Sequence, residues 1–186
     1  MVPDINGPDG VHGIAVLLHP HPDFGGSRFH PFIDGLFRRL PEVGVGAVRI
    51  DFASADQLAA RTDVSAALDA GMTRWPKSPL VLVGYSFGAG IAASVSDDRI
   101  SGWYLLAPPT DSLAGAPIGS DPRPKAIVVP EHDQFFPPEA TARAVAGWAS
   151  TTVTTAPNAD HFLGHVDPIV YEAMAWIGRI ATPDTP

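Results

Sequence analysis

The chain has 186 residues, 45% of them hydrophobic, and a formal net charge of −8 at pH 7. A chain of this length and composition is expected to form one domain, residues 1–186, whose core needs no metal or disulfide for stability. The sequence contains no cysteine, which excludes a disulfide framework, a thiol nucleophile and a thiolate metal site. The negative charge and the lack of a basic run disfavour nucleic acid as a partner. Neither a signal pattern nor an apolar run of membrane-spanning length is present, so we expect a cytoplasmic protein with no membrane contact.

Short apolar runs alternate with longer amphipathic stretches along the chain. The apolar runs predict six strands, at residues 13–18, 46–50, 80–83, 100–106, 125–129 and 151–155. Helices are predicted at residues 29–40, 87–96, 137–149 and 168–180, together with a long helix that Asp56 caps and Pro76 ends. Residues 107–124 hold five prolines and are expected to form a long surface loop. Residues 182–186 are expected to fray.

The predicted strands are apolar throughout instead of alternating between apolar and polar residues, as expected for a parallel sheet that is covered on both faces. The predicted fold class is therefore α/β, with a doubly wound, mainly parallel sheet of about six strands and helices on both faces. In such a fold, ligands bind beyond the carboxyl ends of the strands. The polar residues that follow the strands are, in chain order, His19 and His21, Asp51, Ser86, Asp111, Asp133 and His161.

The third predicted strand leads into Gly84-Tyr85-Ser86-Phe87-Gly88, a Gly-x-Ser-x-Gly pattern. In a sharp strand-to-helix turn of this kind the serine backbone is strained, and the glycines are needed because side chains there would collide with neighbouring backbone. The turn would present the Ser86 hydroxyl at a helix N-terminus, where free N–H groups favour an oxyanion. A serine nucleophile needs a base, and the base needs a carboxylate, so the histidines and aspartates at the same edge become candidates. The five-residue pattern alone fits an ordinary glycine-rich turn equally well. Whether Ser86 is a nucleophile therefore depends on the other motifs in the chain.

Four motifs follow one another along the chain: Leu18-His19-Pro20-His21-Pro22 with Gly25-Gly26, Gly84-Tyr85-Ser86-Phe87-Gly88-Ala89, Leu106-Ala107-Pro108-Pro109, and Ala159-Asp160-His161-Phe162. In content and order they resemble the α/β-hydrolase superfamily and, within it, the small capless group related to dienelactone hydrolases. The resemblance spans nearly the whole chain and implies a minimal α/β-hydrolase fold without a cap domain. It also implies a catalytic triad of Ser86, Asp133 and His161, and an oxyanion hole formed by the Phe87 N–H and one N–H in the loop after the first strand.

Two assignments within this site stay open between alternatives. Pro20 and Pro22 have no N–H, so the His21 amide is the first choice for the second oxyanion donor, with Asp23 or Phe24 in reserve. Asp111, at the end of the fourth strand, competes with Asp133 for the role of the acid. We favour Asp133 because it lies in a tight turn instead of a long loop.

The loop after the second strand departs from the family pattern. Relatives commonly carry Phe-Arg-Gly-x-Gly-x-Ser there, whereas this chain has Asp51-Phe52-Ala53-Ser54-Ala55-Asp56. The resemblance therefore does not indicate how this part of the pocket wall is formed. Dienelactone hydrolase itself uses a cysteine, so Ser86 weakens the transfer of its substrate. The pairs His19 with His21 and His161 with His165 have metal-like spacings but are interrupted by proline or glycine, so we expect neither a metal nor a cofactor.

The sequence therefore predicts a serine hydrolase that cleaves small esters or thioesters through an acyl-enzyme. The expected partner is a small-molecule substrate, and neither nucleic acid nor a membrane. The alternatives are a catalytically silent protein of the same fold that binds a ligand or partner, and an acyltransferase. Short acyl chains are expected, because residues 107–124 are too few to form a helical cap and contain only Leu113 and Ile118 as large apolar residues. The acyl group, the leaving group and the oligomeric state are not specified.

Overall fold

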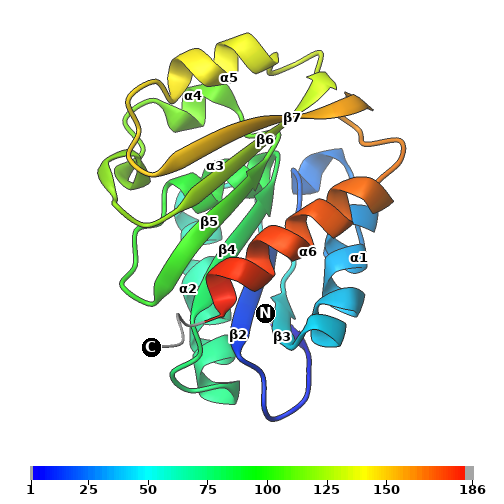
Figure 1. Ribbon diagram of the computed structural model, residues 1–186, viewed down its shortest axis with the longest axis vertical. Coiled ribbons are helices and arrows are strands. Elements are labelled where there is room, and N and C mark those ends of the chain that lie inside the picture. The colour runs from blue at the N-terminus through cyan, green and yellow to red at the C-terminus, as the bar shows by residue number, and fades with distance from the viewer. Residues whose placement is uncertain (1, 183–186) are drawn as a thin grey trace.

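The central feature of the fold is a seven-stranded sheet with the order β1-β3-β2-β4-β5-β6-β7 (Figure 1). It is seen in a computed structural model that describes residues 2–182, so most of the end expected to fray, residues 183–186, lies outside the described part. The neighbouring strands are parallel except for β1 and β3, which are antiparallel. The predicted fold class is confirmed. The strands are β1 (Asp4–Asn6), β2 (Gly13–Leu18), β3 (Val45–Arg49), β4 (Leu80–Tyr85), β5 (Ile100–Leu106), β6 (Lys125–His132) and β7 (Thr151–Asp160).

Helices cover both faces of the sheet, as predicted. They are α1 (Pro31–Arg39), α2 (Gln57–Arg74), α3 (Phe87–Ala93), α4 (Thr110–Leu113), α5 (Pro138–Ala144) and α6 (Asp167–Ala181). On the face shared by α1 and α6, their side chains pack with Ala15 and Leu17 of β2 (Figure 1). On the opposite face, α2, α3 and α4 pack with Ile14, Val16 and Leu18 of the same strand. Every residue of β2 is buried as a result, which explains its unbroken apolar sequence.

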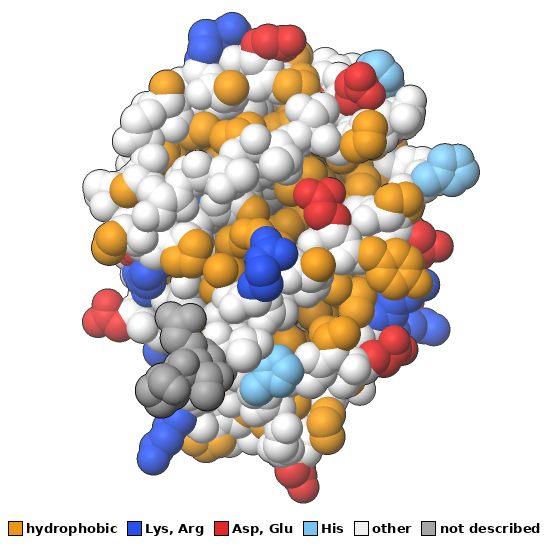
Figure 2. All heavy atoms as spheres, viewed as in Figure 1, with side chains coloured by type: hydrophobic (Ala, Val, Ile, Leu, Met, Phe, Trp, Pro, Cys, Tyr) orange, Lys and Arg blue, Asp and Glu red, His pale blue; other side chains and the backbone are white. Residues whose placement is uncertain are grey.

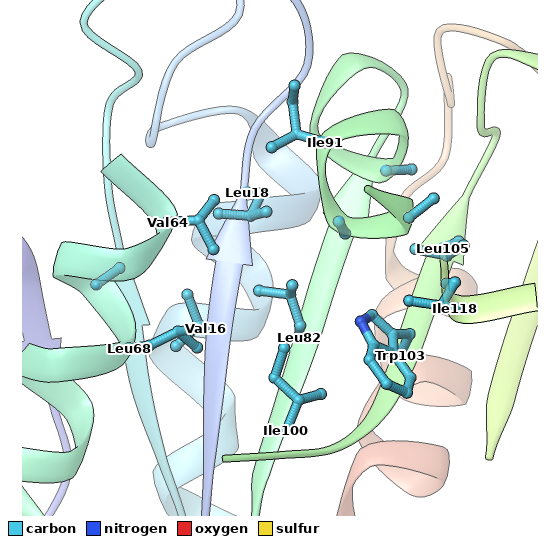
Figure 3. Close-up of a cluster of buried hydrophobic side chains, with 14 of the residues drawn as sticks. Val16, Leu18, Val64, Leu68, Leu82, Ile91, Ile100, Trp103, Leu105 and Ile118 are labelled. Atoms are coloured by element: carbon cyan, nitrogen blue, oxygen red, sulfur yellow. The ribbon is translucent and has the colours of Figure 1, made fainter. Parts of the chain in front are cut away.

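The core on the α2 and α3 side joins β3, β2, β4, β5 and β6 to these two helices and to the connection after β5, and Figure 3 shows the part around β2, β4 and β5. Full burial of one Leu or Ile side chain contributes about 1.5–3 kcal/mol relative to its exposure, so this cluster is a major source of stability. It also fixes the carboxyl ends of β2 and β4, from which the loop with His19 and the turn with Ser86 emerge. The buried residues labelled in the figure are Val16, Leu18, Val64, Leu68, Leu82, Ile91, Ile100, Trp103, Leu105 and Ile118.

Local capping determines where the first two helices begin. Asp56 caps α2, and its Oδ1 accepts a hydrogen bond from Ala59 N at 2.9 Å, as predicted. His30 caps α1 through Nδ1, which accepts a hydrogen bond from Phe32 N at 3.3 Å. Pro31 then occupies the first helical position, where its missing N–H costs nothing. The helix therefore starts at residue 31 and not at residue 29.

The largest differences from the predicted strands are at β1, β6 and β7, whereas β3 and β4 differ by one or two residues at their ends. The short edge strand β1 was not predicted, because three residues are too few to show a pattern. The apolar runs also understate β6 and β7, since Pro130 lies within one strand and Pro157 within the other. The two strands nevertheless pair from Lys125 with Thr151 to His132 with Asp160, across a register shift after Pro130. Proline is tolerated on β7 because it is the edge strand.

The segment at residues 107–124 is not the irregular surface loop that its prolines predict. It contains the single helical turn α4 and a 3-10 turn at Pro117–Ser120. Leu113 and Ile118 are fully buried in the core beneath these turns. The prediction was wrong because the two side chains cover the sheet beside α3, a contact that local sequence does not reveal. The connection from β5 to β6 is therefore a short packed segment and not a cap domain.

The face covered by α1 and α6 is chemically mixed (Figure 2). Lys and Arg side chains are scattered among acidic and apolar ones and form no continuous basic surface on the described atoms of this face. None of the helices within residues 2–182 has both the length and the apolar character needed to cross a membrane.

Candidate active site

Ser86 lies in the turn between β4 and α3, at the carboxyl edge of the sheet. Its backbone has φ 52° and ψ −116°, a strained combination for a residue with a side chain. A hydrogen bond from Ser86 N to Leu106 O, at 2.9 Å, holds the turn against β5. A Cβ at Gly84 would lie 2.3 Å from Gly88 O, and a Cβ at Gly88 would lie 2.4 Å from Leu18 O. Both glycines are required by these close approaches, which confirms the predicted turn.

His161 and Asp133 extend from Ser86 in one hydrogen-bonded chain. His161 Nε2 lies 3.0 Å from Ser86 Oγ, and His161 Nδ1 lies 2.8 Å from Asp133 Oδ2. The Asp133 side chain is fully buried, and its second oxygen accepts hydrogen bonds from Phe135 N and Phe136 N at 2.9 and 2.8 Å. A carboxylate can only accept, so Nδ1 carries the proton and Nε2 is left as an acceptor toward the serine hydroxyl.

Backbone contacts hold the His161 loop in place. Its N–H donates to Gln134 Oε1 at 3.2 Å, and its carbonyl oxygen accepts a hydrogen bond from the Tyr85 hydroxyl. Burial raises the pKa of Tyr85 far above its usual value, with a further contribution from nearby carboxylates, so this hydroxyl stays a donor. Asp160 accepts a hydrogen bond from Phe162 N at 3.0 Å and braces the loop. Sequence reasoning missed Tyr85 and Gln134, because neither stands at a position with a recognisable spacing.

The structure separates the two candidate acids. Asp133 follows β6 and contacts His161 directly. Asp111 lies in α4, its side chain is exposed, and it makes no hydrogen bond to His161. Only Asp133 is therefore placed to orient the imidazole in this arrangement.

The two backbone amides predicted to form the oxyanion hole have no hydrogen-bond partner in the described part of the chain. Within residues 2–182, neither the His21 N–H nor the Phe87 N–H donates a hydrogen bond to the protein. The reserve donors are both engaged, since Phe24 N donates to His21 O at 3.2 Å and Asp23 N donates to His21 Nδ1 at 3.3 Å. The rings of His21 and Phe87 meet edge to face, with centroids 4.9 Å apart. This leaves the two predicted amides free to bind an oxyanion.

His19 has a structural role in the loop after β2. Its Nδ1 contacts Pro20 O at 2.6 Å, and its Nε2 accepts a hydrogen bond from Phe52 N at 2.9 Å. Burial lowers its pKa, which favours the neutral ring that both contacts require. With both nitrogens occupied, His19 ties this loop to the loop after β3 and has no nitrogen left for a metal. Asp51 is likewise engaged, because it accepts hydrogen bonds from Arg28 N and Nε at 2.7 and 2.6 Å. No group of three potential ligands that could hold a metal ion is found in the described part of the chain.

The lining of a pocket of about 380 Å³ includes His21 and Phe87, the two residues whose amides are free. The loop after β3, which departs from the family pattern, contributes Ala55 to the pocket lining, and α2 contributes Gln57. The loop after β2 contributes His21, and the remaining wall comes from α3, from α4 and from Pro109 just before α4. The lining residues are His21, Ala55, Gln57, Phe87, Gly90, Ile91, Pro109, Asp111 and Ser112.

Aromatic rings surround His161. The ring centroids of Phe135, Phe136 and Phe162 lie 5.0, 5.5 and 6.0 Å from that of His161, all in edge-to-face contact. Phe135 and Phe162 are each more than half exposed, so they form an apolar rim at the surface. The described lining of the pocket includes none of these rings. The histidine thus borders an aromatic rim, and the free amides border the pocket.

Comparison with solved structures agrees with this architecture. An α/β serine hydrolase homologue from Coxiella burnetii is 25% identical, with a TM-score of 0.79 over 95% of this chain and 89% of its own. An α/β serine hydrolase without a lid from Xanthomonas campestris is 22% identical, with a TM-score of 0.82 over 99% and 89% of the two chains. Dienelactone hydrolase from Anabaena variabilis is 15% identical, with a TM-score of 0.76 over 95% and 90%. No protein-family model and no curated protein matches the sequence. The chain has the α/β-hydrolase fold in its capless, dienelactone-hydrolase-like form.

Proposed function

We propose that this protein is a serine hydrolase that cleaves small esters or thioesters through an acyl-enzyme intermediate. The observation that carries the proposal is the continuous hydrogen bonding from Ser86 Oγ to His161 Nε2 and from His161 Nδ1 to Asp133 Oδ2. The free amides of His21 and of Phe87, the residue after the serine, are the proposed donors to a developing oxyanion. The fold is shared with proteins named serine hydrolases and esterases, which agrees with this chemistry.

In the first half of the proposed reaction, Ser86 Oγ attacks the carbonyl carbon of the substrate and its proton passes to His161 Nε2. The carbonyl oxygen takes up the negative charge and accepts hydrogen bonds from the His21 and Phe87 amides. Collapse of the tetrahedral intermediate breaks the bond to the leaving oxygen or sulfur. His161 returns its proton to that atom, and the acyl group remains on Ser86.

Water completes the cycle by the same route. It loses a proton to His161 Nε2 as its oxygen attacks the acyl carbon, and the bond to Ser86 Oγ then breaks with return of that proton to the serine. Asp133 stays ionised throughout, holds the proton on Nδ1 and stabilises the imidazolium that forms twice in each cycle. Its buried side chain and its two backbone donors keep it in position for this task.

Labelling of Ser86 is the decisive experiment. A fluorophosphonate probe should form a covalent adduct that mass spectrometry locates on the peptide containing Ser86. Ser86→Ala should abolish labelling and lower the turnover of p-nitrophenyl acetate by about 10⁴-fold or more, since the triad acts as a unit. Ser96 is an exposed serine just after α3, and Ser96→Ala serves as the matched control. This variant should keep both the labelling of Ser86 and the turnover of p-nitrophenyl acetate.

The alternatives give different results in the same experiment. A catalytically silent binding protein would show neither labelling nor turnover, and Ser86→Ala would not differ from the parent. An acyltransferase would be labelled at Ser86, but acyl transfer to an added alcohol or amine would far exceed hydrolysis. Equal turnover by the parent and Ser86→Ala, with matching circular dichroism, would refute the proposed reaction.

A further inference from the structure

The pocket beside the free amides contains a single charged side chain. Asp111 contributes the only carboxylate to its described lining, and neither Lys nor Arg is part of that lining. Within residues 2–182, the Asp111 carboxylate forms no ion pair and accepts no hydrogen bond of the kind that anchors Asp51 or Asp97. Its negative charge is therefore uncompensated by the protein and available to a ligand.

The α4 turn that carries Asp111 is packed against the helix that follows Ser86. In the turn of α4, the Ser112 hydroxyl donates to Pro109 O at 2.6 Å. The same turn packs directly on α3, because a Cβ at Gly90 would lie only 2.8 Å from Ser112 Oγ. Helix α3 begins with Phe87, whose amide borders the pocket. The backbone of Asp111 and the Phe87 amide thus belong to two packed helices, which keeps the Asp111 side chain on this side of the site.

The position of the pocket indicates which part of a substrate it receives. His161 must protonate the leaving group, so that group lies beside His161 and its aromatic rim. The pocket is lined by His21 and Phe87, which bind the carbonyl oxygen, and its described lining does not include His161. Because the leaving group lies beside His161, the acyl part of the substrate extends away from the histidine and into this pocket.

We propose that the pocket binds an acyl chain whose far end carries a positive charge, with Asp111 as the opposing charge. This inference rests on the proposed hydrolase function and names its substrate class: esters or thioesters of short cationic acids. The Gln57 amide, also in the lining and exposed, adds a hydrogen-bond acceptor for an ammonium group. Anionic acyl chains meet the same carboxylate as a repulsive charge and have no cation in the pocket to bind them.

The effect is modest, because Asp111 is exposed to water. An exposed ion pair of this kind corresponds to a gain of about two- to fivefold in kcat/KM. Repulsion should lower kcat/KM for an anionic chain by a similar factor. Both effects should shrink toward one in 0.5 M potassium chloride, where the screening length falls to a few ångströms.

Three p-nitrophenyl esters of matched shape test this assignment. Their acyl groups are 4-(trimethylammonio)butanoyl, its neutral carbon isostere 5,5-dimethylhexanoyl, and 4-sulfobutanoyl. Each kcat/KM is divided by the rate of hydroxide-catalysed hydrolysis of the same ester, which removes differences in intrinsic reactivity. The parent, Asp111→Asn and Asp98→Asn are compared. Asp98→Asn makes the same change in net charge at an exposed aspartate just before β5, at the opposite edge of the sheet.

We expect the parent and Asp98→Asn to favour the cationic over the neutral ester by two- to fivefold and to disfavour the anionic one. Asp111→Asn should bring both ratios close to one. Equal rates on the cationic and neutral esters in the parent, or a cationic preference that survives in Asp111→Asn, would overturn the inference while leaving the hydrolase function intact. Failure of the parent to hydrolyse any ester, p-nitrophenyl acetate included, would instead refute the proposed function and the inference together.

Discussion

Replacement of Gly88 by alanine should disable the site without touching any of its side chains. A Cβ at this position would lie 2.4 Å from Leu18 O and 2.6 Å from His19 O, both of them backbone atoms. Ordinary contact begins near 3.4 Å, so the loop after β2 has to move by about 1 Å. That loop carries the His21 amide, and a displacement of this size removes it as an oxyanion donor. Loss of one such donor lowers kcat by about 10²- to 10³-fold, and the overpacking itself costs about 1–3 kcal/mol of stability.

The assay combines turnover of p-nitrophenyl acetate with urea unfolding of the same samples. Gly178→Ala is the matched control, because a Cβ there meets nothing within 4 Å, and this variant should keep its activity and show an unfolding midpoint equal to or slightly above that of the parent, since alanine is favoured over glycine within a helix. Fluorophosphonate labelling of Gly88→Ala should become slower but should still occur at Ser86. A folded Gly88→Ala with a loss of kcat below tenfold would show that the loop accommodates the methyl group or that the His21 amide is not a donor.

Asp133→Asn should lower kcat for p-nitrophenyl acetate about 10⁴-fold, because it leaves the imidazole in the wrong tautomer. A larger loss in Asp111→Asn would instead assign the role of the acid to Asp111 in α4. Across a p-nitrophenyl ester series, kcat/KM should peak between acetyl and butyryl and fall by octanoyl, since the proposed acyl pocket contains the charged Asp111 and the buried Leu113 and Ile118 add no apolar wall to it. A steady rise to decanoyl would contradict this. Burial lowers the pKa of His30 to about 4, so the unfolded chain takes up a proton below about pH 6.5 while the folded chain does not. The free energy of unfolding should therefore fall between pH 6.5 and 4 by at most about 3 kcal/mol. Urea unfolding of His30→Asn, in which asparagine keeps the helix cap, should show a smaller fall over the same pH range. An equal fall in the parent and in His30→Asn would exclude His30 as its source.

The elements that could be predicted are those with a strong local cause. The buried strands β2 and β4 appear as unbroken apolar runs because both faces of the sheet are covered. The turn at Ser86 was predictable because its two glycines reflect close backbone approaches that no other residue permits. The start of α2 was predictable from Asp56, whose side chain satisfies an N–H of the first turn.

The elements that could not be predicted depend on partners far away in the sequence. β7 is a strand beyond residue 155 because β6 pairs with it, although its residues are mostly exposed and include a proline. Leu113 and Ile118 appeared to belong to a surface loop, yet they fill the space between the sheet, α3 and α5. The hydrogen bond from Tyr85 to the backbone of His161 spans 76 residues and follows from no pattern in the chain.

The sequence by itself determined the fold class, the serine turn and a short set of histidines and aspartates at one edge of the sheet, because local periodicity and glycine sterics suffice for these features. The tertiary structure decided which of these side chains meet. It placed Asp133 and not Asp111 against His161, occupied both nitrogens of His19 and left the His21 amide free. It also placed Asp111 in the pocket beside that amide. Such choices are made by distances between loops at the ends of parallel strands, and these distances depend on the register and twist of the whole sheet.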